Sequence, residues 1–179
     1  MARAGGRSAR AVTVSIRELR AGDDTWLDTW LGACAASVRY DVITSDAPSA
    51  SLHTATERDL TAKIIVAAEP VGVITYRLDS PSQNDAIIEF VGIEPSFARR
   101  GHGQAGASLL EAELRAAGVR RIFAPAPEAH GIAMYFWIRL GYRPLLRGEW
   151  PCTRDAVAWL ARDLVANGMG SGSPASRRR

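Results

Sequence analysis

Apolar and polar positions alternate with two different periods along the chain, and these periods predict strands interleaved with helices. Residues 12–19 alternate with a period of two, which predicts a first strand. The apolar side chains of residues 26–38 recur with helical spacing, behind Asp23 or Asp24 as a helix cap. A hairpin is expected over residues 64–78, because its two apolar halves are separated only by Glu69 and Pro70.

The same reading extends over most of the remaining chain. It predicts a short helix over Thr54–Leu60, strands over Ala86–Ile93, Arg121–Ala124 and Tyr142–Leu146, and helices over Gly103–Ala117 and Gly131–Leu140. Residues 155–164 fit a helix on composition alone. No internal repeat is visible.

The most informative stretch runs from Val91 to Ala117, where a strand leads through a basic turn into a helix. The turn contains Arg99 and Arg100 followed by Gly101-His102-Gly103. Glycines allow positive φ and close backbone approach, and a helix start leaves amide hydrogens unpaired. Together with the helix dipole and two guanidiniums, these features predict a phosphate or pyrophosphate site. An ordinary strand-to-helix turn is the alternative, because short glycine motifs often match by chance.

This turn resembles motif A of the GNAT superfamily of acyl-CoA-dependent acyltransferases, Arg/Gln-x-x-Gly-x-Gly/Ala. Gly101 and Gly103 match its two small positions, whereas Ala98 stands where the family has Arg or Gln to brace the loop. The resemblance implies that main-chain amides from Arg99 to Gln104, including that of His102, bind the pyrophosphate of acetyl-CoA.

A second segment, His130 to Tyr142, resembles the family's Asn-x-x-Ala-x-x-Phe-Tyr-x-x-x-Gly-Phe helix. Gly141 and the aromatic after it match the helix end. His130 stands where Asn is usual, and Trp137 stands where a tyrosine usually hydrogen-bonds the departing CoA sulfur. Because the two motifs occur in the right order and at the right distance, the resemblance extends over roughly residues 12–164.

The family fold is α/β, with a mixed, mostly antiparallel sheet of six to seven strands splayed in the middle and about four helices. The resemblance makes residues 156–164 a final strand and implies one domain over residues 11–165. Residues 1–10 and 166–179 are expected to be disordered tails. In the splayed gap, the main chain of Val91, Gly92 and Ile93 is expected to pair with the pantetheine amides.

Catalytic roles in this resemblance fall on three residues. Glu89 is the expected base for the amine proton, and a strand period of two places it on the face of Val91 and Ile93. Its alternative role is an edge glutamate or a structural ion pair. Trp137 can offer only an indole N–H to the thiolate. His130 either reaches the sulfur or caps a helix, and Tyr135 is expected in the core.

The acceptor pocket is expected to contain Trp30, Tyr40 and Trp150, because aromatic side chains suit a cationic amine. Trp26 and Trp30 are also spaced as a helix's core face. The leading prediction is acetyl transfer to a primary amine of a small molecule. The alternatives are an acyl-CoA-binding module with weak or no catalysis, and an acetyltransferase of protein N-termini or lysines.

Charge and composition add limits to this interpretation. The formal charge is +3, but residues 1–10 and 166–179 hold six arginines and no acid. The remaining chain has 16 basic and 19 acidic residues, so no nucleic-acid partner is expected. The chain has two cysteines without metal-ligand spacing and no run of about 18 apolar residues, so neither a metal nor a membrane span is expected. A cytoplasmic protein of a high-GC bacterium is expected, and GNAT domains often form homodimers.

Overall fold

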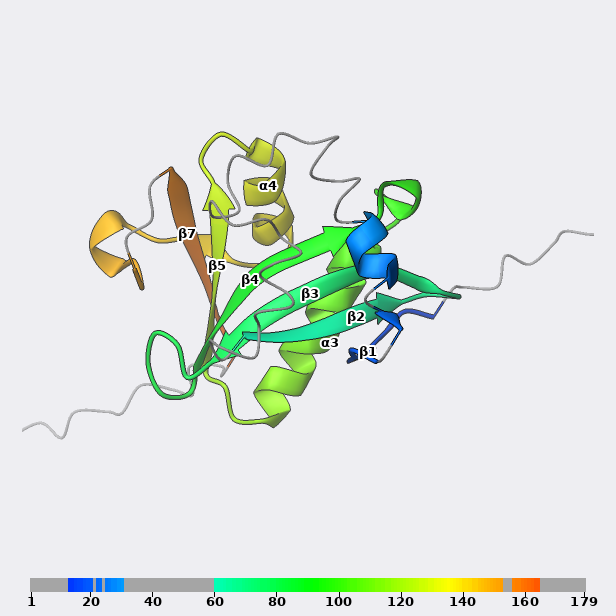
Figure 1. The fold of residues 1–179 in the computed structure, drawn as a ribbon. Coiled ribbons are helices and arrows are strands. Elements are labelled where there is room, and N and C mark those ends of the chain that lie inside the picture. Colours follow the sequence, from blue (N-terminus) through cyan, green and yellow to red (C-terminus); the bar gives the residue numbers. More distant parts are fainter. Residues whose placement is uncertain (1–12, 21, 24, 31–59, 153–155, 165–179) are drawn as a thin grey trace, which may run out of the picture.

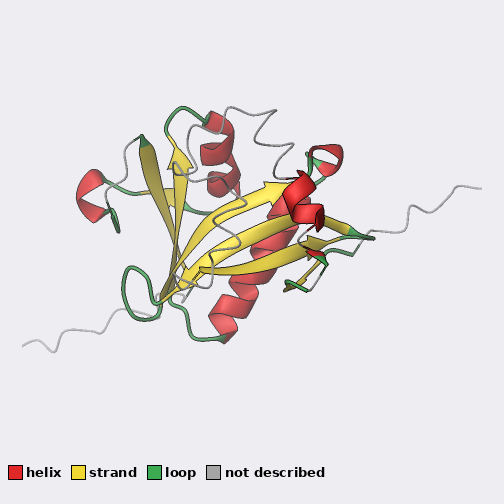
Figure 2. Ribbon diagram, viewed as in Figure 1, coloured by secondary structure: helices red, strands yellow, loops and turns green. Residues whose placement is uncertain are grey.

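The computed structural model describes residues 13–20, 22–23, 25–30, 60–152 and 156–164. These residues form a mixed α/β fold around a seven-stranded sheet (Figures 1 and 2). The strands are β1 (Ser15–Glu18), β2 (Leu60–Val66), β3 (Pro70–Leu78), β4 (Asp85–Ile93), β5 (Arg121–Pro127), β6 (Arg143–Pro144) and β7 (Val157–Asp163). The helices are α3 (His102–Ala116), α4 (Gly131–Arg139), the 3-10 turns η2 (Pro95–Phe97) and η3 (Arg147–Glu149), and the helical residues 25–30.

The sheet is antiparallel except at its centre. Its strand order is β1-β2-β3-β4-β5-β7-β6, and β4 and β5 are the parallel neighbours. Parallel neighbours need a crossover connection, which α3 supplies between β4 and β5. The expected fold class is therefore confirmed.

The expected splay in the middle of the sheet is also present. β4 and β5 pair only from Asp85 opposite Arg121 to Ile87 opposite Phe123. β4 then continues to Ile93 and β5 to Pro127, and the two strands diverge in Figure 1. Beyond Ile87, the edge of β4 that faces β5 is therefore not paired with that strand.

Different layers cover the two faces of the sheet. α3 lies behind the sheet in Figure 1, and its buried residues share one core with Ile65, Ile74 and Ile88. A Cβ on Gly106 would lie 2.6 Å from Ile65 Cδ1, so α3 packs too closely on β2 for any larger residue. The helical residues 25–30 lie in front, where Leu27 and Trp30 pack with Ile64 and Val73.

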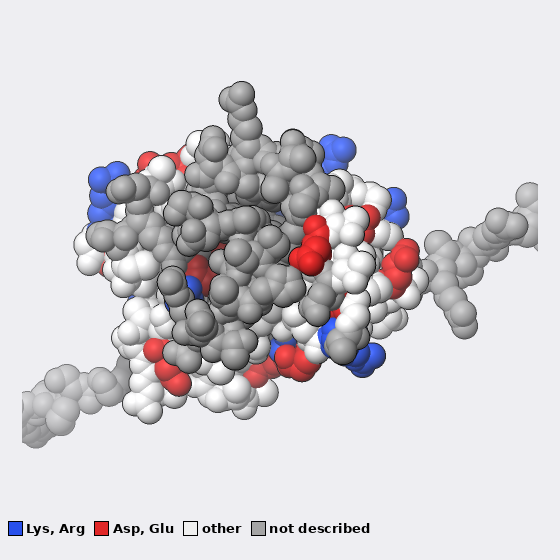
Figure 3. All heavy atoms as spheres, viewed as in Figure 1, with Lys and Arg blue, Asp and Glu red and all other residues white. Residues whose placement is uncertain are grey.

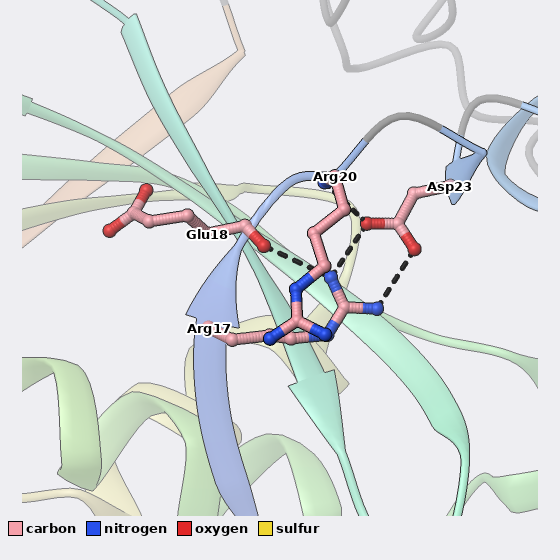
Figure 4. A network of polar contacts seen from close by, with 4 residues as sticks. All are labelled: Arg17, Glu18, Arg20 and Asp23. Carbon is pink, nitrogen blue, oxygen red and sulfur yellow. Dashed lines mark hydrogen bonds and ion pairs between the residues drawn. The ribbon is translucent and has the colours of Figure 1, made fainter.

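Ion pairs secure the β1 edge of the sheet. The Arg17 guanidinium donates two hydrogen bonds to the Asp23 carboxylate, of 2.6 and 2.8 Å (Figure 4). Asp23 also accepts a hydrogen bond from the backbone N–H of Arg20, which fixes the turn that follows β1. Lys63, the only lysine in the chain, bridges Glu18 of β1 and Glu113 of α3 at 2.8 and 2.7 Å.

Several predicted elements have different limits in the structure. Leu60, expected at the end of a helix, begins β2, and the rest of that helix lies outside the described residues. The strand expected over Tyr142–Leu146 is only the two-residue β6, because the Tyr142 N–H bonds back to Trp137 O of α4 and Leu146 caps the 3-10 turn η3. Residues 157–163 form β7, which confirms the strand interpretation of this segment.

Candidate active site

The basic turn after β4 has the backbone geometry of an anion site. Gly101 precedes α3 in the left-handed conformation, with φ 85°, and a Cβ there would meet nothing within 4 Å. The first helical bond runs from Ala105 N–H to Gly101 O at 2.9 Å. The amides of His102, Gly103 and Gln104 precede that bond and have no partner within the helix. The first turn of α3 holds no acidic residue, so nothing in that turn opposes an anion there.

Phe97 contacts the side chains of Arg100 and His102 in this turn. The Arg100 guanidinium lies over its ring at 5.6 Å, and the His102 ring meets it edge-on at 6.4 Å. Phe97 ends η2, whose N–H groups at Phe97 and Ala98 bond to Glu94 O and Pro95 O. At position 98 this chain has alanine instead of the Arg or Gln that supports the loop in the family. Here the 3-10 turn and the Phe97 ring support the loop instead.

The end of β4, the start of α3 and α4 lie against one another. A Cβ on Gly103 would lie 3.3 Å from Ile93 Cγ1, 3.6 Å from Phe136 Cε2 and 3.7 Å from Val91 Cγ1. This close packing brings Val91, Ile93 and Gly103, which the sequence assigned to one site, against Phe136 of the second motif. It also places the unpaired amides of α3 next to the diverging end of β4.

Gly92 has a packing role in addition to its place on β4. A Cβ there would lie 2.5 Å from the Phe90 ring and 2.9 Å from Trp30 Cη2. Trp30 is 5% exposed and stacks on Trp26 with ring centroids 5.3 Å apart. Trp30, expected in the acceptor pocket, is therefore a core residue that covers β4, as its helical spacing with Trp26 allowed.

Glu89 lies at a β-bulge in β4, and the bulge decides which neighbouring residues share its face of the sheet. The pairing of β3 with β4 steps from Tyr76 opposite Ile88 to Thr75 opposite Phe90, so Glu89 is an extra residue. Ile88 and Val91, three residues apart, both pack toward α3. The expectation that Glu89 shares the face of Val91 and Ile93 is therefore wrong, because it assumed an unbroken strand period.

The Glu89 carboxylate turns instead toward Arg77. Its Oε1 lies 3.1 Å from Arg77 Nε, and the Glu89 side chain is 12% exposed. Arg77 pairs with Ile87 across β3 and β4, so both members of this ion pair lie on the face opposite α3. The Glu89 position is two residues past Ile87, where pairing between β4 and β5 stops.

On α4, Trp137 and Tyr135 have exchanged their expected environments. Trp137 is 4% exposed and packs against Phe136 and Tyr142, with ring centroids 4.9 Å from each. Tyr135, expected in the core, is 60% exposed. The face of α4 that carries Trp137 packs against the core. This burial argues against direct contact between Trp137 and a thiolate. His130 precedes α4 without a side-chain cap bond, so its expected role as a cap is not seen.

The remaining acceptor residues lie in different parts of the chain. Trp150 donates its indole N–H to Leu145 O at 3.2 Å and packs against the cluster of Ile87, Phe123 and Trp159. This cluster lies on the face of the sheet that also carries Glu89. Tyr40 lies outside the described residues.

The profile of the acetyltransferase (GNAT) family matches residues 24–142. The chain belongs to the GNAT family. It is an acyl-CoA N-acetyltransferase, and this confirms the family resemblance of the two motifs. No curated protein matches the chain in sequence.

Solved structures share the fold of this GNAT acetyltransferase. An acetyltransferase from Thermus thermophilus is 21% identical with a TM-score of 0.68, covering 85% of this chain and 97% of its own. The ribosomal-protein-S18-alanine N-acetyltransferase from Escherichia coli is 14% identical with a TM-score of 0.65, covering 87% and 97%. The PaiA N-acetyltransferase from Thermoplasma acidophilum, solved in complex with coenzyme A, is 13% identical with a TM-score of 0.63, covering 84% and 99%.

Two polar groups of this GNAT acetyltransferase were not found from its sequence. Arg77 was read only as a strand residue, because its pairing with Glu89 depends on the register of β3 and on the bulge. Glu111 is 4% exposed on α3 and binds Arg162 of β7 at 2.7 Å. The helical spacing of Glu111 with buried Ala107 and Leu114 was the available signal that it faces the core.

The described residues also limit other kinds of site. They contain no group of three or more His, Cys, Asp or Glu side chains that could hold a metal ion. None of the described helices is long and apolar enough to cross a membrane. On the face drawn in Figure 3, the described basic and acidic side chains are interspersed around the rim rather than gathered in one basic patch.

Proposed function

We propose that this GNAT acetyltransferase transfers an acetyl group from acetyl-CoA to a primary amine of a small molecule. One observation carries the proposal: the unpaired amides at the start of α3 lie beside the end of β4 that has separated from β5. An anion cradle next to an unpaired strand edge suits a ligand that has a pyrophosphate at one end and amides along its arm.

The residues at this place fit an acyl-CoA. Backbone amides from Arg99 to Gln104 would hold the pyrophosphate, and the left-handed Gly101 lets the loop present them. The main chain of Val91 to Ile93 would pair with the amides of the pantetheine arm, as an added strand would. When bound, acetyl-CoA supplies the activated thioester that an amine attacks.

Glu89 is our candidate for the group that takes the proton of the attacking amine. Glu89 follows Ile87, the last residue of β4 that pairs with β5, by two positions. Its carboxylate lies on the face of the sheet opposite α3. An acceptor that reaches β4 from the face opposite α3 would meet this carboxylate. Loss of a general base commonly lowers the rate by about 10²–10⁴-fold.

In this proposal Trp137 has a packing role on the buried face of α4. Its side chain is 4% exposed and carries no phenol, so in this proposal residue 137 gives the departing thiolate no hydrogen bond, and the thiolate takes its proton from water. A thiolate is a good leaving group, so the absence of a specific acid slows turnover without preventing it.

Transfer to a protein N-terminus remains a second candidate acceptor reaction. The ribosomal-protein-S18-alanine enzyme shares the fold, as does an N-acetylglutamate synthase from Neisseria gonorrhoeae solved with coenzyme A and N-acetyl-glutamate. These two proteins act on different acceptors, so the shared fold does not select between a peptide and a small amine. A cytoplasmic location, a homodimer and the absence of nucleic-acid and membrane partners stay predictions from the sequence.

The test is calorimetric titration with acetyl-CoA, followed by thiol release with spermine, 2-phenylethylamine, L-glutamate and an alanine-initiated peptide. Release with one of the first three amines supports the proposal, and release with the peptide alone supports a protein acceptor. Tight acetyl-CoA binding without release on any amine would favour an acyl-CoA-binding module. Failure to bind acetyl-CoA would contradict both the transferase and the binding module.

A further inference from the structure

Arg77 and Glu89 form an ion pair between neighbouring strands at the point where the sheet splits. Their Nε and Oε1 atoms are 3.1 Å apart, and their side chains are 33% and 12% exposed. Arg77 Nε is buried and makes no hydrogen bond of normal geometry, so its contact with the carboxylate is mainly ionic. The guanidinium therefore stays close to Glu89 without using this donor in a directional bond.

Alternation along the first half of β4 brings these two side chains together. Glu89 lies two residues after Ile87, which pairs with Arg77, so Glu89 and Arg77 share the face opposite α3. The bulge places both Glu89 and Phe90 between Ile88 and Val91, which face α3, so Val91 does not share the face of Glu89.

The other charged groups near this face are engaged elsewhere or lie at its far end. Asp85, Arg121 and Asp163 lie at the start of β4 and β5 and the end of β7, where Arg121 Nε is 3.3 Å from Asp163 Oδ1. The residues of β5 and β7 that follow on this face, from Phe123 to Trp159, are apolar. Asp28 is exposed on the helical residues 25–30 and has its own polar interaction. Arg77 is therefore the cation that the described residues place against Glu89.

From this geometry we infer that Arg77 is a positioning residue for the proposed base. It holds the Glu89 side chain at the split, where the carboxylate can accept the amine proton. The apolar surroundings screen the attraction between the two charges only weakly, so the ion pair keeps the carboxylate in one place. The inference rests on the proposed role of Glu89 and adds a residue on a different strand.

The test compares Arg77→Gln and Arg77→Lys with wild type, using acetyl-CoA and whichever amine of the panel above is acetylated fastest. For Arg77→Gln we expect kcat to fall by about tenfold while KM for the amine stays nearly constant, because the carboxylate is no longer held in position. Arg77→Lys keeps the charge and should recover most of the loss. The affinity for acetyl-CoA should not change in either variant.

Arg121→Gln is the matched control, because Arg121 also has a buried Nε without a hydrogen bond and one carboxylate partner on the same sheet. It should lower Tm about as much as Arg77→Gln and leave kcat unchanged.

The outcomes separate this inference from the proposed function. If Glu89→Gln lowers kcat and Arg77→Gln does not, Arg77 is only structural and the inference is wrong. If Glu89→Gln itself leaves kcat and the pH profile unaltered, the base assignment fails, and the inference fails with it. In a Glu89→Gln background, Arg77→Gln should give no further loss of kcat/KM.

Discussion

Arg162 joins three elements through one guanidinium nitrogen, which lies 2.7 Å from Glu111 Oε2 and 2.6 Å from Leu140 O. Glu111 belongs to α3, Arg162 to β7, and Leu140 ends α4. Tyr142 is buried beside them, and this burial, with the charge of Glu111, raises the pKa of its hydroxyl. The pair thus connects the helix of the anion site with the helix that carries Trp137.

This relationship predicts an unusual dependence of stability on pH. Burial raises the pKa of Glu111 above its ordinary 4.5, although Arg162 opposes the shift. A raised carboxyl pKa means that the folded state holds the proton more tightly, so the contribution of Glu111 is largest below pH 4.5 and falls as pH rises toward the folded pKa. The free energy of unfolding of wild type relative to Glu111→Gln should therefore decrease over that interval in urea titrations.

Asp23 supplies a control of opposite sign. The hydrogen bond from Arg17 lowers the pKa of Asp23 below its ordinary 3.8. Its stabilisation is therefore present above pH 3.8 and is lost as pH falls through the folded pKa. Relative to Asp23→Asn, wild type should gain stability as pH rises through that interval. Equal slopes for the two variants would contradict the assigned environments of both carboxylates.

Gly101 offers a test of the anion site with a control in the same helix. Gly101 and Gly118 flank α3 at its two ends, both have positive φ, and a Cβ on either would meet nothing within 4 Å. Valine at either position should cost about 1–3 kcal/mol of backbone strain. Only Gly101→Val should also weaken CoA binding, by about tenfold or more, because it distorts the amides of the cradle. Calorimetric titration that shows equal CoA affinities for the two variants would refute the site.

Glu89→Gln tests the proposed base directly. The amide keeps the size of the side chain and removes its ability to accept a proton. We expect kcat/KM to fall by about 10²–10⁴-fold and its acid limb to flatten, while acetyl-CoA affinity stays nearly constant. An unchanged pH profile measured by thiol release would leave His130 or bulk water as the proton acceptor.

Trp137 is expected to affect stability more than chemistry. Trp137→Ala should lower the free energy of unfolding by about 3–5 kcal/mol, because it empties a buried aromatic site. Trp137→Tyr should lower Tm less and change kcat by under about threefold. A clear rise in kcat for Trp137→Tyr would show that a phenol at this position reaches the sulfur. Tyr135→Phe, at an exposed position of the same helix, should leave both Tm and kcat unaltered.

The sequence by itself determined the order of strands and helices, the basic glycine turn and the two motifs that indicate the family. These features depend on local periodicity and on short-range backbone needs, such as the positive φ at Gly101. Four side-chain environments were decided only by the tertiary structure. A bulge at Glu89 separates its face from that of Val91 and leaves it beside Arg77, the packing of α4 buries Trp137 and exposes Tyr135, and the close approach of Gly92 makes Trp30 a core residue. A single inserted residue reverses the face of every side chain near it, and helix orientation depends on partners far away in the chain, so neither can be read from local pattern.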